Sequence, residues 1–138
     1  MTDRANLLPW ADLLRRASEA REYSYSPYSH YKVGAALLTT NGKVYTGCNI
    51  ENAAYTPSIC AERTAIAKAV SEGERDFAAI AVVTADGGAP CGVCRQVMRE
   101  FAPSLVVIVG KTEGDYQVLK LSDLLPHSFG PENLIAPV

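Results

Sequence analysis

Apolar side chains recur along the chain at helical spacing in three segments. Residues 7–18 place apolar or small side chains on one face of a helix and charged side chains on the others. Residues 60–70 are rich in alanine and are followed by Gly73, a residue typical of helix ends. Residues 91–101 end just before Pro103, which cannot continue a helix. The pattern therefore predicts three main helices.

Shorter apolar runs between these helices predict five strands. Residues 33–39 and 44–49 flank Asn41-Gly42, a dipeptide that provides the two positive-φ positions of a tight hairpin turn. Nearly continuous apolar runs are typical of strands that are covered on both faces. Two further predicted strands, residues 77–84 and 105–110, are such runs, and the last predicted strand, residues 116–119, follows the turn-like Glu113-Gly114-Asp115. A short helix over residues 122–125 follows the last strand.

The order of these elements predicts an α/β fold, with a mixed five-stranded sheet sandwiched between helices in three α/β/α layers. No repeat, low-complexity tract or charge run divides the sequence, so residues 1–138 are interpreted as a single domain. In such sheets a ligand usually lies at strand ends, where helices begin. Cys60 and Cys91 both stand at predicted helix starts, which directs attention to that edge.

Composition narrows the possible partners and the compartment. The formal charge of −2 argues against a polynucleotide or an anionic membrane, because both select for clustered positive charge. The longest purely apolar stretch, residues 77–83, is far shorter than the roughly 18 residues that a membrane-spanning helix needs. The N-terminus lacks the pattern of a secretory signal, so the cytoplasm is the expected location. Thiols stay reduced there, and the four cysteines are expected to bind metal or to act in catalysis.

The cysteines are the strongest candidates for chemistry. Cys91 and Cys94 form a C-x-x-C motif, which alone fits a redox pair, half a zinc site or chance. A third thiol at a helix start, Cys60, favours a metal, because the helix dipole stabilises the thiolate and soft sulfur ligands favour zinc. A catalytic zinc has three protein ligands and an open position, whereas a structural zinc has four. Cys48 is the candidate fourth ligand, but we interpret it as a small core residue.

Glu62 follows Cys60 by two residues. An acidic side chain in the first turn of a helix is favoured by the dipole and needs no function. Next to a metal with an open position, however, a carboxylate can take a proton from water and return it to a leaving group. The combination of Cys60-Ala61-Glu62 with Pro90-Cys91-x-x-Cys94 makes the second interpretation the more specific one.

With these motifs the sequence resembles the cytidine deaminase family, whose zinc signature is a His or Cys ligand, a Glu two residues on, and a later P-C-x-x-C. It is most similar to the small enzymes that act on free nucleosides, use three cysteines and form homotetramers. The resemblance covers nearly the whole chain. Five segments carry it: S-P-Y-S at 26–29, V-G-A-A-L at 33–37, G-C-N-I-E-N-A-A-Y at 47–55, C-A-E-R-T-A at 60–65 and P-C-G-V-C-R-Q at 90–96.

The resemblance implies zinc-dependent hydrolytic deamination of cytidine and 2′-deoxycytidine to uridine and 2′-deoxyuridine, with release of ammonia. It implies one zinc ion per chain on Cys60, Cys91 and Cys94, and proton transfer by Glu62. Arg63 would offset the excess negative charge of three thiolates by donating hydrogen bonds to sulfur, and Arg95 is a weaker candidate for the same role. An implied homotetramer has its active sites at subunit interfaces.

The substrate-binding residues that the resemblance implies are Tyr31, Asn49, Glu51, Ala61, Ala89 and Phe129. Asn49 and Glu51 match a ribose-binding pair, and the main chain at Ala89 matches an acceptor for the 4-amino group. The family usually has Phe where Tyr31 stands, so the hydroxyl is a departure that must find a partner. Phe129 matches a residue that covers the base in a neighbouring subunit.

Two alternatives remain open from the sequence. The same zinc core could deaminate another small cytosine-bearing or purine compound, although a deoxycytidylate enzyme would need a cationic phosphate clamp that we cannot locate. The protein could instead be a non-catalytic zinc-stabilised binding module with Cys48 as the fourth ligand, which Glu62 argues against.

Overall fold

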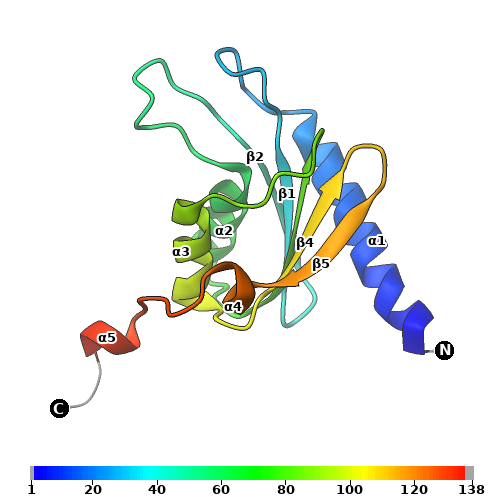
Figure 1. Cartoon of the computed structure of the whole chain (residues 1–138), viewed down its shortest axis with the longest axis vertical. Coiled ribbons are helices and arrows are strands. Elements are labelled where there is room, and N and C mark those ends of the chain that lie inside the picture. The colour runs from blue at the N-terminus through cyan, green and yellow to red at the C-terminus, as the bar shows by residue number, and fades with distance from the viewer. Residues whose placement is uncertain (1, 136–138) are drawn as a thin grey trace.

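A mixed five-stranded sheet forms the centre of the protein (Figure 1). The computed structural model describes residues 2–135. The strands are β1 (Gly34–Thr39), β2 (Val44–Cys48), β3 (Phe77–Thr84), β4 (Val106–Lys111) and β5 (Tyr116–Lys120). Their order is β2-β1-β3-β4-β5, with β3 and β4 parallel and the other neighbours antiparallel. The predicted mixed sheet is thus confirmed.

Helices cover both faces of this sheet. The helix α1 (Thr2–Arg21) lies on one face, and α2 (Ala61–Ser71) and α3 (Gly92–Phe101) lie on the other (Figure 1). Each face has its own apolar core: Leu13 and Ala17 of α1 pack on one side, whereas Ile66 of α2 and Met98 of α3 pack on the other. The architecture is therefore the three-layer α/β/α sandwich that the element order predicted.

Close packing of α2 against β2 fixes the helix start that carries Cys60. A Cβ atom added at Gly47 of β2 would lie 2.7 Å from the carbonyl oxygen of Ala61 and 2.7 Å from the amide nitrogen of Ala65. A Cβ atom essentially never lies that close to another heavy atom, so glycine is required for α2 to approach the strand. The sheet thereby sets the position of the first turn of α2.

Three details differ from the prediction. The helix α1 extends beyond residues 7–18, because an apolar pattern reports the buried face of a helix and not its polar ends. In the β1–β2 hairpin, Gly42 has a positive φ of 89° but Asn41 does not, so a four-residue loop replaces the predicted two-residue turn. A short α4 (Leu121–Leu124) was predicted, but α5 (Glu132–Ile135) was not, because α5 buries no side chain and leaves no apolar pattern.

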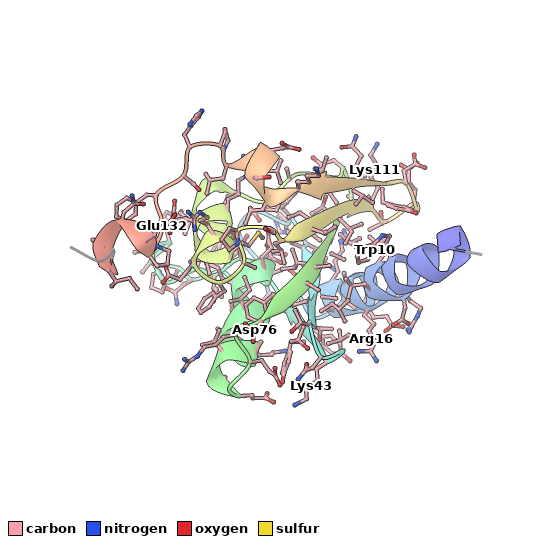
Figure 2. All side chains as sticks on the ribbon, turned by 90° about the horizontal axis from the view of Figure 1, so that it is seen from below. Trp10, Arg16, Lys43, Asp76, Lys111 and Glu132 are labelled. Atoms are coloured by element: carbon pink, nitrogen blue, oxygen red, sulfur yellow. The ribbon has the colours of Figure 1, made fainter. Side chains whose placement is uncertain are left out.

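The ends of the described chain lie far apart, with α5 and its residue Glu132 at the opposite end of the molecule from α1 (Figure 2). The helix α1 has 20 residues and carries exposed charged side chains, among them Arg15 and Glu19. Within residues 2–135, no helix combines the length and apolar character needed to cross a membrane.

Candidate active site

Three sulfur atoms meet where α2 and α3 begin. Cys60 is the N-cap residue of α2, Cys91 is the N-cap residue of α3, and Cys94 lies in the first turn of α3. The Sγ atoms of Cys60 and Cys91 are 3.9 Å apart, and all three sulfurs lie within 4.8 Å of one another. The structure therefore brings together the three cysteines that the sequence analysis selected.

This cluster fits zinc. Four ligands placed tetrahedrally at the Zn–S distance of about 2.3 Å would have sulfurs about 3.8 Å apart, close to the Cys60–Cys91 separation. Sulfur is also the donor that favours zinc over magnesium or calcium. Among the described residues, no other His, Cys, Asp or Glu belongs to the cluster, so zinc would keep a position open for water. Cys48 is half-buried and lies outside it.

The charges within the cluster favour binding of a cation. Hydrogen bonds from Cys94 and then from Arg63 lower the pKa of the Cys60 thiol to about 5. The hydrogen bond to Cys60, together with burial, raises the pKa of Cys94. One thiolate therefore forms readily but opposes ionisation of its neighbour, and a dication would relieve that opposition.

The two candidate arginines have different contacts. The Nη2 atom of Arg63 lies 3.5 Å from the Sγ of Cys60, as a role in offsetting thiolate charge requires. Arg95 donates instead to the carbonyl oxygens of Pro90 and Leu124, each at 2.7 Å. The suggestion that Arg95 donates to ligand sulfur is therefore wrong, because its guanidinium is used to tie two main-chain segments together.

Glu62 is buried in the first turn of α2, with 4% of its surface exposed, and it lines the same cavity as Cys60. Burial and the Cys60 thiolate raise the pKa of its carboxyl from 4.5 to about 7. A carboxyl that exchanges its proton near neutral pH is suited to act as a general acid and base. The position and the electrostatics agree with the predicted role.

A cavity of about 340 Å³ opens above these groups. That volume is at the small end of the range for small-molecule sites. Four of the six residues predicted to bind substrate line it. Lining residues are Tyr31, Asn49, Glu51 and Ala89, whereas Ala61 is fully buried and only its sequence neighbours Cys60 and Glu62 line the cavity.

Asn49 and Glu51 are held by the chain itself. The Oδ1 atom of Asn49 accepts hydrogen bonds from Ser24 and Val33, and its Nδ2 donates to the carbonyl of Tyr31 at 2.8 Å. Glu51 accepts from the amide nitrogens of residues 28 and 29 and from the Ser29 hydroxyl. Both side chains are thus fixed before any ligand arrives, and Asn49 retains one free N–H.

Phe129 is absent from the lining of this cavity. Its side chain is 57% exposed, and its carbonyl oxygen accepts a hydrogen bond of 2.7 Å from Nε2 of Gln96. The segment that carries it extends away from the sheet (Figure 1). The main chain is therefore anchored on α3 while the ring remains available to another molecule.

Sequence reasoning missed several groups that shape the cavity. Ser29 holds Glu51, and the loop after β3 is built around Thr84 and Asp86. The extra hydroxyl of Tyr31, a residue that is 41% exposed, was a usable signal, because a phenolic O–H can donate a hydrogen bond that phenylalanine cannot. Its acceptor is Asp86, at 2.7 Å.

A second, open groove of about 920 Å³ lies beside Cys48 and has mixed charges along its walls.

The fold and the site together define a class of protein: a metal-binding α/β/α domain with a carboxylate at an open metal position. The family model for the cytidine and deoxycytidylate deaminase zinc-binding region matches residues 10–110. The chain therefore belongs to this family, which binds zinc.

Relatives and solved structures agree with that assignment. A cytidine deaminase from Halalkalibacterium halodurans is 51% identical over 125 residues, which cover 88% of this chain and 95% of the relative. A probable cytidine deaminase from Dictyostelium discoideum is 48% identical over 126 residues, covering 87% of this chain and 83% of the relative. The crystal structure of cytidine deaminase from Burkholderia pseudomallei matches with a TM-score of 0.83 and 52% identity, covering 86% of this chain and 98% of that one.

Proposed function

We propose that the protein hydrolytically deaminates cytidine and 2′-deoxycytidine to uridine and 2′-deoxyuridine. The observation that carries the proposal is the buried carboxyl of Glu62 beside three converging thiols, in a cavity that Cys60 and Cys91 also line. The names of relatives about 50% identical over nearly the whole chain support the same substrate. We also propose that residues 1–138 act as one domain, which the single sheet supports for the described part.

In the proposed mechanism Cys60, Cys91 and Cys94 hold one zinc ion. When bound, zinc supplies a Lewis acid that makes water nucleophilic at neutral pH. The Glu62 carboxylate takes one proton from the attacking water and passes it to ring nitrogen N3. It then takes the proton of the new C4 hydroxyl and delivers it to the amino group, which departs as ammonia and leaves the C4 carbonyl. In the metal-free protein the pKa of this carboxyl is about 7, and bound zinc would lower it and so favour the carboxylate that accepts the first proton.

The remaining cavity residues would bind and orient the nucleoside. The carbonyl of Ala89 would accept a hydrogen bond from the 4-amino group, and Ala61 can donate or accept a hydrogen bond only through its main chain, since its methyl side chain has no polar atom. Asn49 and Glu51 would bind the ribose, and recognition mainly through the 3′-hydroxyl would admit both nucleosides. The ring of Tyr31 would contact the pyrimidine.

We propose further that the active protein is a cytoplasmic homotetramer in which Phe129 covers the base in a neighbouring subunit. The exposed ring and its anchored main chain support this arrangement. The Phe129 ring does not line its own chain's cavity, but it would contact a bound base if a second chain placed its cavity against this segment.

The direct test is the assay of zinc-loaded protein with cytidine, 2′-deoxycytidine, deoxycytidylate, cytosine and adenosine, following loss of the substrate's ultraviolet absorbance and release of ammonia. We expect turnover of the two cytosine nucleosides. Turnover of adenosine or deoxycytidylate in their place would assign the protein to another branch of zinc deaminases. No turnover at all, with zinc bound, would favour a binding module.

A further inference from the structure

The hydroxyl of Tyr31 enters a hydrogen-bond network in the loop after β3. Its Oη donates to Oδ1 of Asp86 at 2.7 Å. The same carboxylate oxygen accepts from the amide of Gly88 at 3.1 Å and from the hydroxyl of Thr84 at 3.2 Å. The Thr84 hydroxyl in turn accepts from the amides of Gly87 and Gly88, at 2.8 and 3.0 Å. The loop is therefore closed on itself, and Tyr31 joins it from outside.

The main chain of Tyr31 is tied to the opposite wall of the cavity. Its amide donates to the hydroxyl of Ser29 at 3.0 Å, and Ser29 also holds Glu51. Its carbonyl accepts from Asn49 at 2.8 Å. Tyr31 therefore connects the residues proposed to bind ribose with the loop that leads to Ala89, the proposed acceptor for the amino group.

Close approach at Gly88 makes this connection possible. A Cβ atom at Gly88 would lie 2.6 Å from Oη of Tyr31, so a larger residue would displace the hydroxyl. An ionised carboxylate is also a stronger acceptor than a neutral one. In agreement with such a bond, the pKa of Asp86 lies below its ordinary value, with the hydrogen bond from Tyr31 as the main cause.

We propose that Tyr31 and Asp86 form a positioning pair that fixes the distance between the ribose side and the base side of the cavity. The inference rests on the proposed function, which it deepens. Since Thr84 closes the loop independently, the pair is not needed to form the loop. What it adds is a tie across the cavity, which lowers the ordering cost of binding a nucleoside that must touch both walls. A phenylalanine at position 31 would keep the ring but lose this tie.

The test is a double-mutant cycle on the zinc-loaded, full-length protein with Tyr31→Phe, Asp86→Ala and the double variant. We expect each single variant to raise the KM for cytidine about 10-fold, equivalent to about 1.4 kcal/mol, with kcat within about 2-fold of wild type. Asp86→Ala also removes the bonds from Gly88 and Thr84. The double variant should therefore lose no more than Asp86→Ala alone, because Tyr31→Phe removes a bond that Asp86→Ala has already removed. Asp86→Asn, which keeps an acceptor oxygen, should recover most of the loss.

Two controls separate positioning from general damage. Tyr23→Phe removes a hydroxyl from a side chain that is 81% exposed, and should leave the KM unchanged. Hydrogen exchange gives a readout that does not depend on turnover: amides in residues 85–91 should exchange faster in Tyr31→Phe, whereas those of β2 should not.

Additive losses in the double variant, or an unchanged KM with unchanged exchange in Tyr31→Phe, would overturn the inference while leaving the proposed function intact. A wild-type protein that binds zinc but does not turn over cytidine would instead overturn the proposed function, and the inference with it.

Discussion

Glu62 should make the metal-free protein less stable as the pH rises. Its carboxyl has a pKa of about 7 in the folded protein and an ordinary value of 4.5 in the unfolded chain. Below pH 4.5 the group is protonated in both states and costs nothing. Between pH 4.5 and 7 the unfolded chain releases the proton while the folded protein retains it, so the free energy of unfolding falls with rising pH.

The size of the effect follows from the two pKa values. At 1.36 kcal/mol per pKa unit, the difference corresponds to about 3 kcal/mol of stability, lost in full once the pH exceeds 7. Because only 4% of Glu62 is exposed, solvent screening removes little of this amount. Glu62→Gln has no charge to bury. Its free energy of unfolding, relative to that of wild type, should therefore increase by about 3 kcal/mol from acidic to alkaline pH.

The assay is urea unfolding of chelator-treated, reduced protein at several pH values from about 4.5 to about 8, comparing wild type with Glu62→Gln. The comparison at each pH largely cancels the contribution of the thiols, which both proteins share. Glu74→Gln is the matched control. The ion pair with Lys43 lowers the pKa of Glu74, so its carboxylate is ionised in both the folded and unfolded states above about pH 6. Above that pH, the difference in unfolding free energy between Glu74→Gln and wild type should not change with pH. A pH-independent difference for Glu62→Gln would refute the reasoning.

Three further predictions concern the zinc-loaded protein. Elemental analysis should find that Cys48→Ala retains zinc, whereas alanine at any one of three positions loses it: Cys60, Cys91 and Cys94. A Cys48→Ala protein without zinc would make the site structural. Glu62→Gln should keep zinc and lose about 10²- to 10⁴-fold in kcat, and wild-type turnover would remove Glu62 from the mechanism. Phe129→Ala should weaken cytidine binding by about 5- to 150-fold with zinc retained, the range expected for base stacking. Mixing it with Glu62→Gln chains should restore some activity, and no recovery after verified subunit exchange would make Phe129 a packing residue.

The parts of the site that the sequence predicted are those that depend on local structure. A cysteine at a helix start is visible from the residues around it, and so is a glutamate two positions later. Cys60, Glu62 and Cys91 therefore have the positions expected of them. The strands β1, β3 and β4 were predicted for the same reason, since each buries a nearly continuous apolar run.

Contacts between distant segments could not be predicted in the same way. Tyr31 and Asp86 are 55 residues apart, and no periodic pattern links a lone hydroxyl to a lone carboxylate. Asn49 presents a related difficulty, because an amide that binds sugar and an amide that braces a loop look the same in sequence. The structure gives Asn49 the second role, and its one free N–H leaves room for the first.

The contacts of α3 connect the three-cysteine cluster of a chain to the exposed ring of Phe129 in the same chain. The first turn of this helix carries Cys94, and the next residue, Arg95, ties the loop before the helix to the segment that follows β5. Gln96, the residue after Arg95, donates to the carbonyl oxygen of Phe129. Arg99, one turn further along, donates to the hydroxyl of Ser128. A shift of α3 on metal binding would therefore move the ring as well. If Phe129 covers a neighbour's base, a single rigid helix then aligns parts of two active sites, and metal loading in one subunit should affect substrate binding in the next.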